Sequence, residues 1–130
     1  LETARGVTEE ERFDAGKAIQ FPIYGDRIWE SLENVPDEQR SNIPRYLTEV
    51  CFGDLYTRAG LDLQTRELLI LCVLCALGDT QVQITSHAVG NLKVGNSRET
   101  IIAAVTQCLP WIGFPRTLNA IRLIKDITIE

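Results

Sequence analysis

The chain has 130 residues, of which 45% are hydrophobic and 24% are charged, a composition typical of one globular domain. This composition excludes a disordered or fibrous protein, and a formal net charge of −5 without a lysine or arginine cluster argues against nucleic acid as a partner. The sequence shows neither an apolar signal segment nor a membrane-spanning run, so we expect a cytoplasmic protein.

Helix start and stop signals follow one another along the chain, and no segment alternates as a strand does. We therefore expect an all-α bundle of about six or seven helices, built as a single domain over residues 1–130. Thr8, which precedes three glutamates, predicts the start of a first helix, and Pro22 predicts its end. A short helix is predicted over residues 26–33 and a turn over residues 34–37.

The middle of the sequence predicts two helices that meet at a glycine-containing turn. Pro44 suits the first turn of a helix that continues through Arg58. Asp62 is the predicted cap of a central helix that ends at Gly78. Residues 68–77 of this helix are uninterruptedly apolar, which is typical of a core helix that is surrounded on every side.

Three further helices are predicted in the last third of the chain. The first ends at Gly95. Its candidate stripes for burial are Val82, Ser86, Val89 and Lys93, or the more apolar Val82, Thr85, Val89 and Leu92. Ser97 is the predicted cap of the next helix, which Pro110 ends or kinks, and its apolar residues Ile101, Val105 and Cys108 recur at helical spacing. The last helix is predicted to begin near Pro115 and to bury Leu118, Ile121, Ile124 or Lys125, and Ile127 or Thr128.

The four cysteines are too few, and too deeply embedded in apolar sequence, to form a secreted disulfide framework. Cys72 and Cys75 have the spacing of a redox motif, but they lie inside the apolar run, where burial raises the pKa of a thiol. We therefore expect core packing instead of redox chemistry. No second pair or nearby histidine completes a zinc site.

Ionisable residues gather immediately before the apolar run. Tyr56, Arg58, Arg66 and Glu67 all lie there, and charges next to a core helix must be either paired or functional. His87 follows in the next predicted helix and is the only histidine of the chain. It is also the only side chain whose unperturbed pKa lies near neutrality.

Four stretches of the chain, taken in order, resemble the carboxymuconolactone decarboxylases, a family that includes the alkylhydroperoxidase D-like proteins. They are residues 11–32, residues 52–69, the helix that carries His87, and residues 111–121. Their order and spacing resemble the γ-carboxymuconolactone decarboxylase branch. The resemblance implies an alkylhydroperoxidase D-like all-α subunit that assembles into a homo-trimer or homo-hexamer.

A decarboxylase of this kind needs no obligatory cofactor, because a lactone carbonyl or its vinylogue can accept the electron pair that carbon dioxide leaves behind. The protein must hold the substrate carboxylate, stabilise the oxyanion and deliver a proton. Arginine suits the first task and histidine the last, so we expect Arg58, Glu67 and His87 to form the site. Tyr56 and Trp111 are candidate lining residues of the same pocket.

Each of these residues also has a structural interpretation. Glu67 either serves the site or pairs with an arginine to satisfy burial, and Arg58 either binds substrate or caps the last carbonyls of its helix. His87 is either a site residue or a satisfied core residue, and the two aromatic side chains either line the pocket or simply pack.

The sequence also departs from both branches of the family. The cysteines of the peroxidase branch are absent at the corresponding positions, because Thr80 and Gln83, or Asp79 and Val82, stand there. The resemblance implies a histidine at position 107 in many decarboxylases of the branch, and this chain has Gln107 there. One residue is also inserted before His87. These departures weaken the assignment of carboxymuconolactone itself as the substrate.

Three functions follow from these patterns. The first is a cofactor-free decarboxylase, or a related proton-transfer enzyme, that acts on a small anionic substrate such as a carboxylated lactone. The second is a thiol-dependent peroxide reductase that uses Cys72 or Cys75. The third is a non-catalytic oligomer that binds a small acid.

Overall fold

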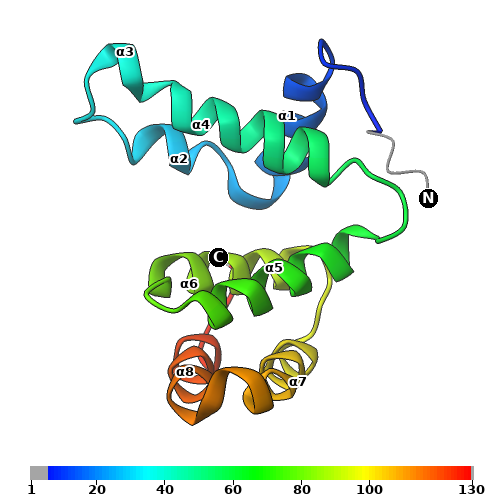
Figure 1. The fold of residues 1–130 in the computed structure, drawn as a ribbon, viewed down its shortest axis with the longest axis vertical. Coiled ribbons are helices and arrows are strands. Elements are labelled where there is room, and N and C mark those ends of the chain that lie inside the picture. Colours follow the sequence, from blue (N-terminus) through cyan, green and yellow to red (C-terminus); the bar gives the residue numbers. More distant parts are fainter. Residues whose placement is uncertain (1–5, 130) are drawn as a thin grey trace. The chain divides into compact units, whose positions relative to one another are not determined.

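The computed structural model describes residues 6–129, and every regular element within them is a helix (Figure 1). The prediction of an all-α protein is confirmed. The helices fall into two compact units, one within residues 1–61 and one within residues 62–130. Each unit is described here by itself, and the single domain over residues 1–130 stays a prediction. Among the described residues, no helix has the length and apolarity needed to cross a membrane.

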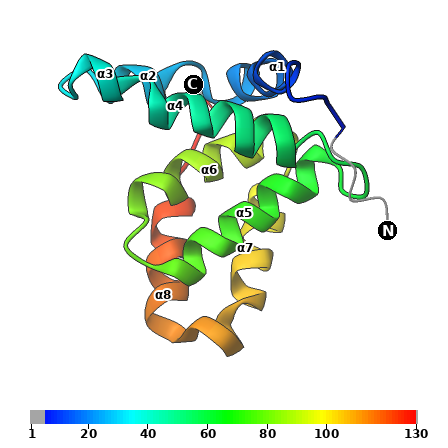
Figure 2. The ribbon, with the colours of Figure 1, turned by 45° about the horizontal axis from the view of Figure 1, so that its top comes forward.

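The first unit packs one long helix against a second helical segment. Its elements are α1 (Arg12–Tyr24), α2 (Arg27–Glu30), α3 (Asp37–Arg40), α4 (Asn42–Tyr46) and the π-helix η1 (Leu47–Leu55). The helix predicted to start at Thr8 begins at Arg12 instead, after a turn in which the Thr8 hydroxyl accepts from the Glu11 amide and the Glu11 carboxylate accepts from the Thr8 amide and hydroxyl. Figure 2 shows α1 and α4 from a second side.

The prediction that Pro22 ends the first helix is wrong. Instead, α1 includes Pro22 and continues to Tyr24, and it ends at Gly25 with a φ of 64°. Proline has no backbone N–H, so it cannot donate the helical hydrogen bond to the carbonyl four residues earlier. That carbonyl belongs to the exposed residue Ala18, where water can replace the lost donor.

The single α-helix predicted from Pro44 to Arg58 is also wrong in detail, because the chain widens into η1 after Tyr46. Here the backbones of α1 and η1 approach each other closely. A Cβ atom on Gly16 would collide with the carbonyl oxygen of Thr48, and one on Gly53 would collide with that of Arg12. The Thr48 hydroxyl lies on the buried side and donates to Gln20 Oε1 over 2.6 Å.

A buried acidic pair in η1 is neutralised by arginines from both sides. Arg12 lies 3.2 Å from Glu49 Oε2 and 3.5 Å from Asp54 Oδ2, and Arg45 Nε lies 2.8 Å from Glu49 Oε1. The hydrogen bond from Arg45 lowers the pKa of the Glu49 carboxyl, against the opposing effect of burial, and Arg12 lowers it further. The charges of this unit therefore support its fold.

The second unit is a four-helix arrangement of α5 (Leu63–Leu77), α6 (Gln81–Lys93), α7 (Arg98–Gln107) and α8 (Leu109–Ile124). Both predicted caps are confirmed, because Asp62 accepts from the Thr65 amide over 2.8 Å and Ser97 accepts from the Thr100 amide over 3.1 Å. The break predicted between Pro110 and Pro115 occurs at Gly113, where α8 is kinked and φ is 78°.

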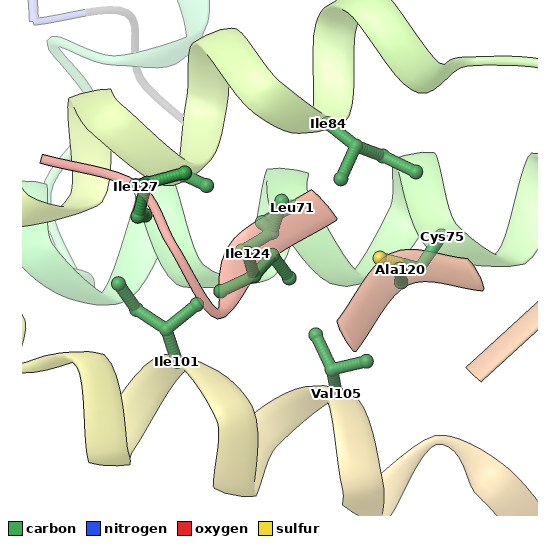
Figure 3. Packing of buried hydrophobic residues seen from close by; sticks show 9 residues of the cluster. Leu71, Cys75, Ile84, Ile101, Val105, Ala120, Ile124 and Ile127 are labelled. Atoms are coloured by element: carbon green, nitrogen blue, oxygen red, sulfur yellow. The ribbon is translucent and has the colours of Figure 1, made fainter. Parts of the chain in front are cut away.

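All four helices contribute to the core of this unit (Figure 3). Its buried residues are Leu71 and Cys75 from α5, Ile84 and Ala88 from α6, Ile101 and Val105 from α7, Ala120 and Ile124 from α8, and Ile127. The predictions for Ile101, Val105, Ile124 and Ile127 are confirmed. The expected burial of Leu118 is wrong, because that side chain is exposed and Thr117 and Ala120 lie inside instead.

The predicted inward stripe of α6 is confirmed only in part. Val89 and Leu92 are partly buried and pack against the core, but Val82 is exposed, and the buried residues on this helix include Ile84, Ala88 and Asn91. Ile84, Ala88 and Asn91 also recur at helical spacing, so the predicted stripe and the observed one fit the periodicity of a helix equally well. The contacts of α6 with α5 and α8 select the phase, and no local feature of α6 fixes it.

The central helix α5 buries only one of its faces, although its sequence is apolar all round. Glu67, Leu71 and Cys75 are buried at a spacing of four residues. Leu69, Val73 and Leu77 repeat with the same spacing, two residues out of phase, and all three are exposed. This apolar stripe of α5 therefore lies on the opposite side of the helix from the core.

Candidate active site

Helix α5 places a carboxylate inside the second unit. Glu67 is 0% exposed and lies one turn before Leu71 on the buried face of α5. An ionised carboxylate without partners at such a position would be strongly unfavourable, so its contacts decide what it does. The helix begins after its cap, Asp62, five residues before Glu67, so the cap fixes the position of Glu67 along the helix axis.

The partner of this carboxylate is the lone histidine. Nδ1 of His87 on α6 lies 3.1 Å from Oε2 of Glu67, and the His87 side chain is 20% exposed. With Glu67 ionised, Nδ1 is the donor in this contact, because an ionised carboxylate can only accept a hydrogen bond. The structure thus brings together two of the predicted site residues in a buried carboxylate–imidazole pair.

A third residue at this site was missed by the sequence reasoning. Asn91, on the buried face of α6, donates from its side-chain amide to the main-chain carbonyls of both Glu67 and His87. A signal for it existed, because a polar residue one helical turn after His87 falls in phase with Ile84 and Ala88. That signal depends on the correct phase of α6, which the sequence alone did not provide.

The other predicted site residues have different surroundings. Tyr56 and Arg58 belong to the first unit, where Tyr56 is buried and its ring centroid lies 4.8 Å from that of Phe52. Trp111 lies in the first half of α8 and is 82% exposed. Gln107 is exposed at the end of α7. The assignment of Arg58, Tyr56 and Trp111 as substrate ligands stays a prediction.

The thiols of the second unit are suited to packing. Burial, helped by the neighbouring Cys108 and Cys75, raises the pKa of the Cys72 thiol to about 12. Burial also raises the pKa of Cys75 to about 11, with a further contribution from Cys108. At neutral pH both are therefore protonated, and a protonated thiol is a poor nucleophile. Among residues 6–129, no three histidine, cysteine or acidic side chains are grouped to hold a metal ion.

The chain is similar to known proteins over most of its length. Residues 42–126 match the model of the carboxymuconolactone decarboxylase family. The chain is also similar to a 4-carboxymuconolactone decarboxylase of Acinetobacter baylyi (strain ATCC 33305 / BD413 / ADP1), with 22% identity over 122 residues. That alignment covers 93% of this chain and 90% of the relative. Glu67 and His87 both lie within the range that the family model matches.

Proposed function

The chain belongs to the carboxymuconolactone decarboxylase family, and from this we propose that it is a cofactor-free decarboxylase or related proton-transfer enzyme. Its substrate is a small carboxylated lactone such as 4-carboxymuconolactone, an intermediate of aromatic-compound catabolism. The observation that supports this proposal is the 3.1 Å contact between Glu67 and His87. A buried acid that holds one edge of a partly exposed imidazole is an arrangement suited to proton transfer.

The proposed reaction begins with heterolysis of the bond between the substrate carbon and its carboxylate. Carbon dioxide leaves, and the electron pair moves into the conjugated lactone carbonyl as an enolate. His87, as the imidazolium, then delivers a proton from Nε2 to carbon and regains one from solvent. Glu67 accepts from Nδ1–H throughout, so that it orients the ring and stabilises its cationic form.

The substrate carboxylate needs a cation, and Arg58 is the predicted one because a guanidinium binds carboxylate through two parallel hydrogen bonds. Tyr56 and Trp111 remain the predicted aromatic contacts. An Arg58→Lys enzyme would keep the charge and lose the bidentate geometry. We expect it to raise KM more than it lowers kcat, which steady-state kinetics would measure.

We further propose that the protein acts as a homo-trimer or homo-hexamer. The apolar stripe of α5 supports this, since Leu77 is 65% exposed and Leu69 and Val73 lie on the same side. Exposed apolar surface of this kind is typical of subunit interfaces. Light scattering of the purified protein, compared with Val73→Glu and with the exposed-site control Gln83→Glu, tests the proposal. A monomeric wild type, or an assembly unaffected by Val73→Glu, would reject it.

The two alternatives lack such support. A thiol-dependent peroxide reductase needs a reactive thiolate, whereas burial raises the pKa of both Cys72 and Cys75. A non-catalytic acid-binding oligomer would share the apolar stripe of α5 but would not need the Glu67–His87 contact. Gln107, which the resemblance places where many decarboxylases of the branch carry a histidine, bears on which lactone is accepted.

The decisive experiment measures carbon dioxide release from 4-carboxymuconolactone and from a panel of related carboxylated lactones. We expect turnover of at least one of them by the wild type, and a loss of about 100- to 10,000-fold in kcat for His87→Ala. Gln81→Ala, an exposed change on the same helix, is the matched control. Full turnover by His87→Ala would rule out the proposed mechanism, and no turnover of any lactone would rule out the proposed function.

A further inference from the structure

One buried amide contacts the backbones of both members of the Glu67–His87 pair. The Asn91 side chain is 0% exposed, and its Nδ2 donates to the carbonyl oxygen of Glu67 over 3.0 Å and to that of His87 over 2.8 Å. A primary amide has two hydrogens on this nitrogen, so these two bonds use both of them. Asn91 therefore links α5 and α6 at the two positions from which the pair projects.

The remaining polar atom of Asn91 is held as well. Its Oδ1 accepts from Asn96 Nδ2 over 2.8 Å, and the same nitrogen of Asn96 donates to the carbonyl oxygen of Gln64 over 2.9 Å. Gln64 lies in the first turn of α5, three residues before Glu67. Two amides thus connect α6 to successive turns of α5, and the orientation of Asn91 is fixed from both ends.

A glycine makes this connection possible. Gly95 has a φ of 98°, which lets the chain turn back toward α5 immediately after α6. A Cβ atom at this position would come within 2.7 Å of Gln64 Nε2. The turn therefore brings Asn96 to both Gln64 and Asn91.

We propose that Asn91 is a positioning residue, which sets the separation and rotation of α5 and α6 so that Glu67 faces Nδ1 of His87. The inference rests on the proposed proton-transfer function of that pair. Asn91 acts through the two backbones and takes no part in the chemistry. Neither an aliphatic nor an acidic side chain can replace it, because the two contacts require a pair of N–H donors in one plane.

Asn91 thereby controls which nitrogen of the imidazole carries the hydrogen. With an ionised Glu67 held at Nδ1, we expect the neutral ring to adopt the Nδ1–H tautomer, because the carboxylate can only accept a hydrogen bond. Without Asn91, the helices can shift by a fraction of an ångström, the contact lengthens, and the other tautomer becomes populated. His87 is the only histidine, so its ring nitrogens give resolved signals in a spectrum of the whole protein.

The test is 15N NMR of His87 in uniformly labelled protein, at a pH where the imidazole is neutral. We expect the Nδ1–H tautomer to dominate in the wild type and a mixture of tautomers in Asn91→Leu and Asn91→Asp. Thr117→Val is the matched control, because it removes another buried hydrogen-bond donor from the same unit, one whose acceptor Gly113 belongs to α8 as Thr117 does. An unchanged tautomer in folded Asn91→Leu, or a wild type without the Nδ1–H tautomer, would overturn the proposal.

A milder variant decides the matter if neither Asn91 variant folds. Asn96→Ala removes only the donor to Asn91 Oδ1 and the link to Gln64, and circular dichroism would verify its fold. We expect it to shift the tautomer signals in the same direction by a smaller amount. A folded Asn96→Ala variant with wild-type signals would then reject the positioning role.

The NMR readout separates this inference from the proposed function. If the wild type turns over a lactone, we expect kcat of Asn91→Leu to fall on the order of 100-fold with KM little changed, as misplacement of a catalytic group predicts. A wild type that turns over no lactone would reject the function, while the tautomer measurement would still test Asn91. A normal kcat in Asn91→Leu would count against the positioning role alone.

Discussion

Oε2 of Glu67 lies 3.1 Å from Nδ1 of His87, so a fully buried carboxylate on one helix contacts a partly exposed imidazole on the next. Twenty residues separate the two side chains in the sequence. The contact gives the carboxylate a cationic partner whenever the ring is protonated, and it fixes one ring nitrogen whenever it is not.

Replacement of Glu67 by glutamine is expected to separate stability from turnover. The amide keeps the volume of the side chain and can still bond to Nδ1, so the free energy of unfolding should change little. It cannot stabilise an imidazolium electrostatically, and we expect kcat to fall at least 10-fold. Urea denaturation and carbon dioxide release measure the two effects. Equal turnover by Glu67→Gln and the wild type would show that the charge of Glu67 is not needed.

The thiols of α5 are expected to react slowly in the folded protein. Because burial raises the pKa of Cys72 to about 12 and that of Cys75 to about 11, almost no thiolate is present at neutral pH. Labelling with iodoacetamide, followed by peptide mass spectrometry, should modify both residues far faster in urea than in buffer. Rapid labelling of either residue in buffer would contradict this and would reopen the peroxide-reductase alternative.

The first unit is expected to lose stability in acid through Glu49. Its pKa is lower in the folded than in the unfolded chain, chiefly because Arg45 donates to it. The unfolded state therefore binds a proton more readily, and the stabilisation is present above the ordinary glutamate pKa and lost as the pH falls toward the folded pKa. Glu49→Gln should flatten this pH dependence.

A fluorescence measurement can confine that effect to the unit that holds Glu49. The chain has two tryptophans, and Trp29 lies in the first unit whereas Trp111 lies in the second. In a Trp111→Phe background, urea denaturation followed through Trp29 reports the first unit. Glu38→Gln, an exposed change, is the control and should leave the pH dependence as it is. A pH profile that Glu49→Gln does not alter would contradict the prediction.

The cap of α7 is expected to contribute measurably to the second unit. Ser97→Ala removes the acceptor of the Thr100 amide and should lower the free energy of unfolding by about 1 kcal/mol. Urea denaturation followed through Trp111, in a Trp29→Phe background, measures this loss. Thr106→Ala, an exposed change on the same helix, should cost less. Equal losses in the two variants would show that the cap has no special role.

Features encoded within one turn of helix were predicted from the sequence, and features that depend on distant partners were not. The caps at Asp62 and Ser97 need only the side chain and the amide three residues later, so both were found. The burial of Ile84 and Ala88 in place of Val82 depends on which face meets α5 and α8. The π-helix η1 likewise follows from packing against α1, and its sequence reads as an ordinary helix.

The candidate site was predicted in part for the same reason. His87 and Glu67 were identified from residue chemistry and family resemblance, and their contact required the fold. Asn91 was missed because an asparagine inside a helix has no local signature of a role. Its importance comes from two carbonyl groups, one of them 24 residues away.

The wide turns of η1 determine how this protein tolerates changes in length. A π-helix accommodates about one extra residue relative to an α-helix over the same rise. Deletion of one residue between Thr48 and Gly53 would allow this segment to tighten into α-helical turns, in which residues four apart share a face as residues five apart do in η1. Thr48 and Gly53 would then both still face α1. Homologues that lack this extra residue are therefore expected to keep the residues on the facing side of α1.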